Sequence, residues 1–398
     1  MTGTSTSETS GRATTSTAPP RPPFWRDVRN LAWAFQLVVL AIVLAVIGIL
    51  VNNVRVNSSN QGIPTGFDYL SNPSSFTIPG SSFRDSQPVS EALVVGVLNT
   101  VRVSVAGIIL ATLLGVLLGI GRLSGNFLVR SLSRMYVEFF RNIPLLSIVI
   151  FAYLAIVLTA MPRLENALEI DGLLIVSNRG VVVPWVSGRT GWFLVVLLVA
   201  AVAAWFVWRW RTSFGDRTGN PAREPLWALL AFVAVTVVGG QVLDNGITTP
   251  SLSGGTPRGG ITLQPEYFAL LVALTLYTAS HIAEIVRGSI QAVPRGQDEA
   301  SRALALSGWQ RLRHVILPQA FRIALPPLGN QYLNLMKNSS LGFVISYFEL
   351  TKVTQTSIGN RSPAVPSYLL LMFIYLIMSL IISAVVNVAN RRLEVVGR

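Results

Sequence analysis

Apolar runs of about 20 residues recur along this chain, and they constrain its fold more than any other feature. A helix of that length crosses a hydrocarbon core of roughly 30 Å. Only 12% of the 398 residues are charged, against roughly 25% in soluble domains. The sequence therefore predicts an all-α fold, a polytopic membrane helical bundle of about eight transmembrane helices. The predicted spans are residues 31–51, 92–120, 143–161, 192–208, 226–243, 267–286, 323–347 and 368–386.

The basic residues test this number of helices. Alternate loops, beginning with the N-terminal segment, hold 21 of the 31 lysines and arginines, the other loops hold 8, and Arg102 and Lys337 lie inside spans. Loops rich in lysine and arginine stay on the cytoplasmic side, so both termini are expected in the cytoplasm. The net charge of +13 is spread over loops, whereas a nucleic-acid binder gathers its charge on one face. No nucleic-acid partner is expected.

The composition also bears on chemistry. The chain has no cysteine and two histidines, too few ligands for the common metal sites. A phosphate-binding loop needs a hydroxyl residue after its lysine, but the two lysines, Lys337 and Lys352, are followed by Asn338 and Val353. The chain is therefore not itself a P-loop ATPase. We expect a transport protein that is no enzyme and holds no cofactor or metal.

The ends of the chain differ from its centre. Residues 1–30 are rich in Ser, Thr, Pro and Gly, which predicts a disordered cytoplasmic tail. The apolar run at 31–51 is too long for a cleaved signal peptide, so we expect a retained first transmembrane helix. Residues 391–398 are expected to form a cytoplasmic C-terminus.

One predicted cytoplasmic segment, residues 296–320, is charged and amphipathic although apolar spans surround it. Asp298 and Glu299 open a helical pattern, where acidic side chains suit the positive end of the helix dipole. Ala300 and Leu304 then share a face that is otherwise made of small residues. Such a face lets another surface approach closely.

The pattern breaks at Ser307-Gly308, and a second amphipathic stretch follows. Pro318 suits the first turn of a further helix. Two interpretations remain open. The segment is either a rigid pair of short helices that enters a protein groove, or an interfacial helix that lies on lipid with its arginines toward anionic headgroups.

The same segment resembles the EAA loop of the membrane subunits of bacterial ABC importers. That family's pattern is Glu-Ala-Ala, three residues, Gly, nine residues, Ile, any residue, Leu-Pro. Matching or corresponding positions here are Glu299, Ala300, Ser301 for the second Ala, Ala305 for the Gly, Val315 for the Ile, Leu317 and Pro318. Because Ala305 replaces the turn glycine, Gly308 is expected to supply the break.

Three further stretches, residues 139–146, 277–297 and 325–341, are similar to permeases of the polar amino-acid uptake family, the histidine/glutamine/arginine group. The long tail, the first span and an extra helix pair look most like the larger permease of the general L-amino acid (Aap/Bzt type) systems. The resemblance implies an ABC permease transmembrane domain over residues 89–390, interrupted by a two-helix insertion at 162–264.

This resemblance implies the function of a permease subunit that carries amino acids, of a broad polar range, into the cytoplasm across the bacterial plasma (inner) membrane. The implied partners are a cytoplasmic ABC ATPase dimer, a second permease subunit in a heterodimer, an extracytoplasmic amino-acid-binding protein and membrane lipid. The loop would dock on the ATPase. Its implied docking residues are Asp298, Glu299, Ala300, Leu304, Ala305, Gly308, Leu317 and Pro318.

Two cations inside spans suggest a substrate path. A charge at the bilayer centre costs roughly 3 kcal/mol or more, so such residues usually face the bundle interior or a water-filled cavity. Arg102 and Lys337, with Asn338 and Ser339, would suit a passing carboxylate. The alternatives are snorkelling of both cations toward outer headgroups and contact with the binding protein.

Two other functions remain open on the residues alone. An ion-coupled secondary transporter needs an intramembrane carboxylate, and Glu284 is the clearest candidate, although Arg287 lies three residues away and favours an interfacial ion pair. A membrane scaffold for a cytoplasmic enzyme would carry no substrate at all.

Overall fold

The computed structural model describes residues 28–393 except 187–189, 219–223, 243–246 and 254. The chain divides into two units, Met1–Gly66 and Phe67–Arg398. The first contains α1 (Val28–Asn60), whose segment Leu31–Asn60 is apolar and long enough to span a membrane. The span predicted at 31–51 lies within it. The predicted tail falls almost wholly outside the described residues, as does most of the C-terminal segment 391–398.

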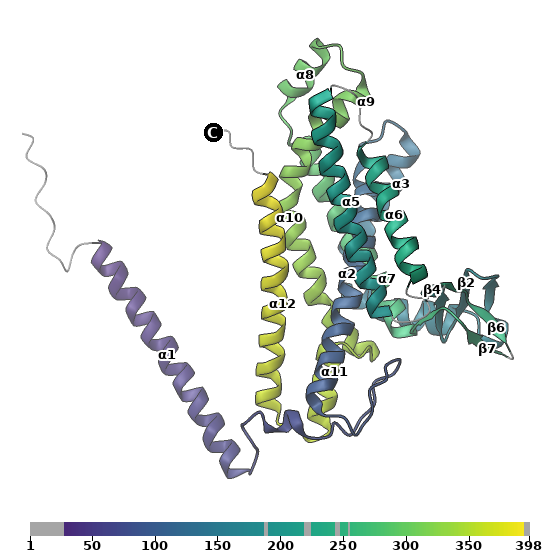
Figure 1. Ribbon diagram of the computed structural model, residues 1–398. Coiled ribbons are helices and arrows are strands. Elements are labelled where there is room, and N and C mark those ends of the chain that lie inside the picture. The colour runs from purple at the N-terminus through teal and green to yellow at the C-terminus, as the bar shows by residue number, and fades with distance from the viewer. Residues whose placement is uncertain (1–27, 187–189, 219–223, 243–246, 254, 394–398) are drawn as a thin grey trace, which may run out of the picture. The chain divides into compact units, whose positions relative to one another are not determined.

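Helices dominate the second unit (Figure 1). The α-helices are α2 (Val89–Gly121), α3 (Phe127–Asn142), α4 (Leu145–Phe151), α5 (Thr190–Thr218), α6 (Glu224–Val242), α7 (Pro265–Gln291), α8 (Arg295–Ala303), α9 (Gly308–Arg311), α10 (Leu317–Asn338), α11 (Leu350–Gly359) and α12 (Ala364–Leu393). The 3₁₀ turns are η1 (Asp68–Ser71), η3 (Leu164–Asn166) and η5 (Ser339–Ile345), and π-helical turns form η2 (Ala152–Ala160) and η4 (Leu312–Ile316).

Each of the eight predicted spans coincides with helix, but the helices differ in how well they suit a membrane. Within the described part of the chain, α1, α2, α5, α7 and α12 are long and apolar enough to cross it. The pair of α3 with α4 and η2, bent by 101°, passes the same test only when its two helices are taken together, as one broken span or a re-entrant loop. The remaining two predicted spans correspond to α6, which is shorter, and α10, which carries polar residues.

The core lies where α2, α4, α7 and α10 meet, and small residues let these helices approach. Gly115 and Gly119 of α2 face α7. A Cβ added at Gly115 would lie 2.6 Å from Cγ2 of Ile282, and one at Gly119 would lie 2.8 Å from the carbonyl oxygen of Ala283. Helices in lipid associate largely through such close packing. The hydrophobic effect does not drive their association, because lipid chains are as apolar as the side chains of the helices.

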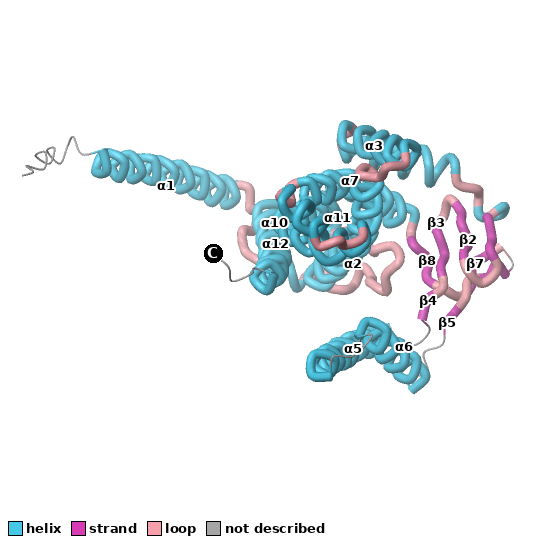
Figure 2. The backbone as a smooth tube through the Cα atoms, turned by 90° about the horizontal axis from the view of Figure 1, so that it is seen from above, coloured by secondary structure: helices cyan, strands magenta, loops and turns pink. Residues whose placement is uncertain are grey.

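Residues 162–264, which the sequence analysis predicts to be a two-helix insertion, contain short strands as well as α5 and α6, and the strands were not predicted. They are β1 (Leu168–Ile170), β2 (Leu174–Ser177), β3 (Gly180–Val183), β4 (Trp185–Val186), β5 (Ile247–Thr248), β6 (Ser251–Ser253), β7 (Thr256–Arg258) and β8 (Ile261–Leu263). All pairs are antiparallel, in the orders β1-β2-β3-β8, β4-β5 and β6-β7 (Figure 2). Strands of two to four residues are too short for an alternating pattern to identify.

The pairing of the strands shows which ends of α5, α6 and α7 lie near the strands. β4 precedes α5 and pairs with β5, which follows α6, so the C-terminal end of α5 and the N-terminal end of α6 lie away from the strands. β8 leads directly into α7, and α8 and α9 follow the far end of α7 (Figure 1). The C-terminal end of α5 and the α8–α9 segment therefore lie on the same side, opposite the strands.

Candidate functional site

The EAA-like loop, residues 295–318, begins with α8. Pro294 precedes the helix and Asp298 stands in its first turn, as the sequence predicts. Ser301 is buried, and its hydroxyl donates to the carbonyl oxygen of Asp298 at 2.7 Å. The loop thus starts as a regular helix in which the Ser301 side chain is held by a hydrogen bond to the helix backbone.

The break after α8 is made by Ala305 and not by Gly308, which corrects the expectation. Ala305 has a φ of +53°, in the left-handed region that favours glycine. Gly308 instead begins α9, where Ser307 forms a capping box with Gln310. Alanine therefore performs the turn at the position where the resembling family has glycine.

Asp298 braces the two arms of the loop. Its carboxylate accepts from Arg302 of α8 at 2.9 Å and from Arg311 of α9, also at 2.9 Å. Because one carboxylate is shared between two helices, their relative orientation is held by charge as well as by the turn. This acid is therefore occupied inside the loop.

None of the described residues covers the outward face of α8. Glu299, Ala300, Ala303 and Leu304 are exposed at spacings that place them on one helix face, and Leu304 is 75% exposed. No ion pair of Glu299 is found among the described residues. Trp309 of α9 is 64% exposed, Leu317 is half-buried, and Pro318 lies in the first turn of α10 as predicted.

A charge cluster joins three helices at the end of α7 that leads into the loop. Glu284 contacts Arg122 at the end of α2 and Arg287 of α7, and its carboxylate lies 4.0 Å from Arg141 of α3. The predicted pair with Arg287 is confirmed. Three arginines around one carboxylate keep that carboxylate charged, which suits a structural tie better than the reversible protonation that ion coupling requires.

Arg102 lies in the N-terminal half of α2, one turn after Asn99, which contacts the segment that leads into α11. Its guanidinium donates to Asn99 Oδ1 at 3.4 Å, and Asn99 Nδ2 donates to the carbonyl oxygen of Phe348 at 2.8 Å. The hydroxyl of Tyr347 donates to the carbonyl oxygen of Asn99 at 3.0 Å. Arg102 itself stays exposed, so its charge is positioned but not covered.

Lys337 belongs to a polar stripe along α10 that the sequence analysis did not identify. Asn330, Asn334 and Lys337 are exposed and follow one another at spacings of four and three residues, while Ala324 and Leu328 on the other side are buried. The spacing was a readable signal. Three exposed polar side chains on a transmembrane helix require water or protein beside them, because lipid cannot satisfy them.

The other two predicted path residues have different environments. Asn338 is half-buried at the end of α10, whereas Ser339 is buried and its hydroxyl donates to the carbonyl oxygen of Met336 at 2.6 Å. No hydrogen bond or ion pair joins Arg102 to Lys337 in the described ranges. The structure thus brings Lys337, Asn338 and Ser339 together, with Arg102 on a separate helix.

Glu349, in the connection before α11 and outside the spans, is a fully buried carboxylate that sequence reasoning missed. It accepts from the backbone N–H groups of Thr351 and Lys352 at 2.8 Å each and from the Tyr375 hydroxyl at 2.9 Å. Burial raises the pKa of Glu349 to about 7, against the opposing effect of these hydrogen bonds. Its contacts tie α11 to α12.

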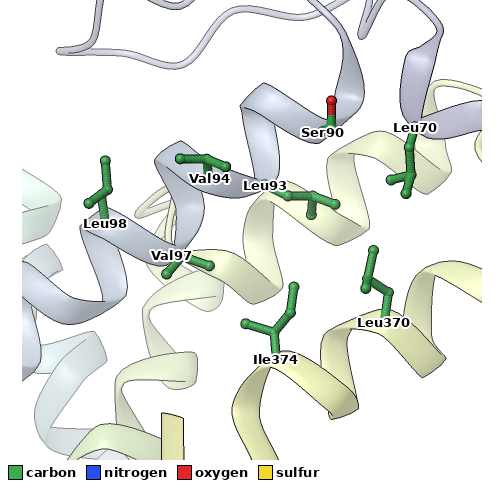
Figure 3. Close-up of a pocket in the computed structure, with 8 residues that line it drawn as sticks. All are labelled: Leu70, Ser90, Leu93, Val94, Val97, Leu98, Leu370 and Ile374. Carbon is green, nitrogen blue, oxygen red and sulfur yellow. The ribbon is translucent and has the colours of Figure 1, made fainter. Parts of the chain in front are cut away.

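A cavity of about 290 Å³ lies between η1, the start of α2 and α12. Figure 3 shows its walls, which are aliphatic apart from Ser90: Leu70, Leu93, Val94, Val97, Leu98, Leu370 and Ile374. A polar substrate would find almost no hydrogen-bonding group there. The cavity is therefore not a candidate for an amino-acid site.

Comparison with known proteins gives extensive matches. The family described as "Binding-protein-dependent transport system inner membrane component" matches residues 225–395. The general L-amino acid transport system permease protein AapQ of Rhizobium johnstonii is 36% identical over 92% of this chain and 92% of its own. The glutamate/glutamine/aspartate/asparagine transport system permease protein BztB of Rhodobacter capsulatus is 34% identical over 94% and 96%. YhdX of Escherichia coli strain K12 is 37% identical over 92% and 95%.

Proposed function

The chain belongs to the amino-acid ABC transporter permeases, and we infer from this membership that it is the transmembrane subunit through which an ATP-driven importer moves amino acids into the cytoplasm. The observation that carries this function is relatedness over more than nine-tenths of the chain, with the EAA-like loop included. The relatives favour this function over an ion-coupled secondary transporter, and the arginine-bound Glu284 agrees.

The partners follow from the family in outline and are proposed in detail. ABC importer permeases are not enzymes themselves and work in the inner membrane with ATPase and binding-protein partners. We propose that ATP hydrolysis occurs on a separate ATPase dimer, that this chain uses no cofactor, and that both its termini are cytoplasmic. We also propose a heterodimer with a second permease, whose surface would enclose a polar path beside the stripe of α10.

We propose that the ATPase docks on the exposed face of α8. Leu304 and the alanines supply a small apolar surface, and Glu299 supplies a charge with no partner among the described residues. The brace of Asp298 with Arg311 supports this assignment, since a coupling element must be stiff to transmit movement. Ala305, Gly308, Leu317 and Pro318 then serve the shape of the loop and its junction with α10.

We propose that the substrate passes along the stripe of α10 toward the EAA-like loop. Toward the start of the helix, Lys337 is followed by Asn334 and Asn330, whose amide groups can both donate and accept hydrogen bonds. Arg102 adds a second exposed cation on α2. Both cations would attract the carboxylate that all amino acids share, while Asn338 and Ser339 shape the end of the stripe.

Reconstitution tests the function directly. The chain is purified with its co-purifying subunits, placed in liposomes, and supplied with the binding protein and radiolabelled amino acids. We expect uptake only when ATP reaches the ATPase side, and no change when ion gradients are collapsed. Uptake that follows an ion gradient without ATP would contradict an ABC importer, and absence of flux in an intact, ATP-hydrolysing complex would favour a scaffold.

A charge-removal experiment tests the substrate path. Arg102→Gln and Lys337→Gln are each expected to slow uptake of acidic, neutral and basic amino acids to a similar degree. The loss should be about tenfold, which corresponds to ~1.4 kcal/mol of a charge-assisted contact. Uptake is normalised to assembled complex, and affinity of the isolated binding protein is measured in parallel.

Arg163→Gln is the matched control, because Arg163 is exposed on the strand side of the molecule, outside the spans. It should leave uptake unchanged. A loss restricted to acidic substrates would indicate side-chain recognition. Unchanged rates for all substrates in both variants would return Arg102 and Lys337 to contact with lipid headgroups.

A further inference from the structure

An aromatic groove that contains an arginine runs along α5 from Trp205 to Phe214. A cavity of about 390 Å³ is open along this face. Its lining residues are Trp205, Phe206, Arg209, Trp210, Ser213 and Phe214. None of the described lining residues is acidic, so Arg209 supplies the charge of the groove.

Two arginines two residues apart have different positions on α5. The guanidinium of Arg211 lies 5.1 Å from the ring centre of Trp227 on α6 and 5.7 Å from that of Phe214, so it packs within the α5–α6 pair. The guanidinium of Arg209 lies 5.9 Å from the ring centre of Trp205 and lines the groove. Among the described residues Arg209 makes no ion pair, so its side-chain N–H groups can donate to a ligand. The neighbouring ring of Trp205 limits the orientations that the guanidinium can adopt.

The groove lies where a spanning helix leaves the hydrocarbon. The apolar segment Val195–Phe214 is 20 residues long, about the length that crosses a bilayer, and the groove residues form its last half. Trp205, Phe206 and Trp210 are 54%, 68% and 63% exposed. Trp210 lies toward the end of this segment, where aromatic rings meet the glycerol and headgroup region of a lipid, whereas Trp205 and Phe206 lie deeper, beside the acyl chains. Chain connectivity places the groove on the same side of the molecule as the EAA-like loop.

We propose that this groove binds the headgroup of an anionic phospholipid. The guanidinium of Arg209 donates to the phosphodiester oxygens, for which its planar fork is well suited. Trp210 packs against the glycerol, and Trp205 and Phe206 pack against the acyl chains. A soluble anion would use Arg209 but not the rings, whereas a lipid uses both. The site therefore anchors the α5–α6 pair to lipid. The aromatic lining of the groove supports this role, and its open shape lets a lipid enter from the membrane.

Lipid binding to the purified full chain tests this site. The chain in detergent is titrated with phosphatidylglycerol or with phosphatidylcholine of the same acyl chains, and bound lipid is counted by native mass spectrometry. We expect preference for phosphatidylglycerol. Arg209→Gln should weaken that binding about fivefold to tenfold, which is the scale of one arginine at a charged membrane surface.

Arg211→Gln is the matched control, since it removes the same charge from the same helix but on the side that packs against α6. It should retain the preference for phosphatidylglycerol, while Trp205→Ala should reduce it. Equal binding of the two lipids, or unchanged binding in Arg209→Gln, would overturn the site. So would competition by glycerol 3-phosphate at the same concentration as the lipid, because it would identify a soluble-anion site. If Arg209→Gln lost a protein subunit from the complex but still bound lipid, the groove would be a protein interface and the lipid site would be overturned.

Discussion

Leu304→Asp is expected to abolish recovery of the ATPase with this chain and, with it, amino-acid uptake. Leu304 is 75% exposed in the chain by itself, so the substitution should leave folding of the permease intact. In the complex the new carboxylate would be buried against the ATPase without a partner. Burial of an unpaired charge costs at least ~3 kcal/mol, which weakens the interface by more than about 100-fold. The measurement is the ratio of ATPase to permease after affinity purification through the permease.

The control for this change is Ala292→Asp, which adds the same carboxylate at an exposed position between α7 and α8. It should preserve both subunit recovery and uptake. Glu299→Lys reverses a charge at the edge of the same face and should reduce transport less severely, since rim charges contribute modestly. Normal recovery of the ATPase in Leu304→Asp would show that α8 is not the docking surface and would favour contact of the loop with lipid.

Gly115→Val is expected to prevent close packing of α2 on α7 and to destabilise the folded chain. A Cβ at position 115 would lie 2.6 Å from Cγ2 of Ile282 and 2.9 Å from the carbonyl oxygen of Ala279. The carbonyl belongs to helix backbone and cannot move aside, so the helices must separate. The cost is expected to be about 2–3 kcal/mol, as for other overpacked cores. The measurement is thermal unfolding in detergent together with the yield of monodisperse protein.

Gly288→Val provides the matched comparison, because a Cβ at Gly288 of α7 meets no atom within 4 Å. The same side chain is added to a helix of the same pair, and the higher helix propensity of valine over glycine should leave stability unchanged or slightly raised. If Gly115→Val and Gly288→Val unfolded at the same temperature, close approach of α2 and α7 would not be what stabilises the core.

The membrane spans could be located from the sequence because each depends on a local quantity. The segments at 92–120 and 267–286 became α2 and α7 with boundaries a few residues wider. The strands of the insertion escaped prediction, since each has two to four residues and is defined by its partner strand. The span at 323–347 shows both situations, because α10 is helical as predicted while its polar face at Asn330 and Asn334 was overlooked.

Within the EAA-like loop, the sequence was sufficient for the motif and insufficient for its geometry. Glu299, Ala300 and Pro318 can be matched residue by residue, and the helix dipole predicts a helix that opens at Asp298, which the structure places in the first turn of a helix that begins at Arg295. The turn was placed at Gly308 because glycine tolerates a left-handed backbone most easily. The structure places it at Ala305, with φ of +53°. The hydrogen bonds of Ser307 and Gln310 begin the next helix and so determine where the turn must lie.

The sequence by itself determined the class of this protein: apolar length determines membrane spans, arginine distribution predicts their orientation, and the loop motif indicates the transporter family. Only the tertiary structure decided which partners the charged residues have. Glu284 forms ion pairs with Arg122 and Arg141, which lie at two other helices, and the Asp298 carboxylate pairs with one arginine of α8 and one of α9. Hydrophobic length and helix dipoles act along the chain and can be read locally. Ion pairs and glycine contacts act over a few ångströms between segments far apart in sequence, so they exist only once the helices have packed.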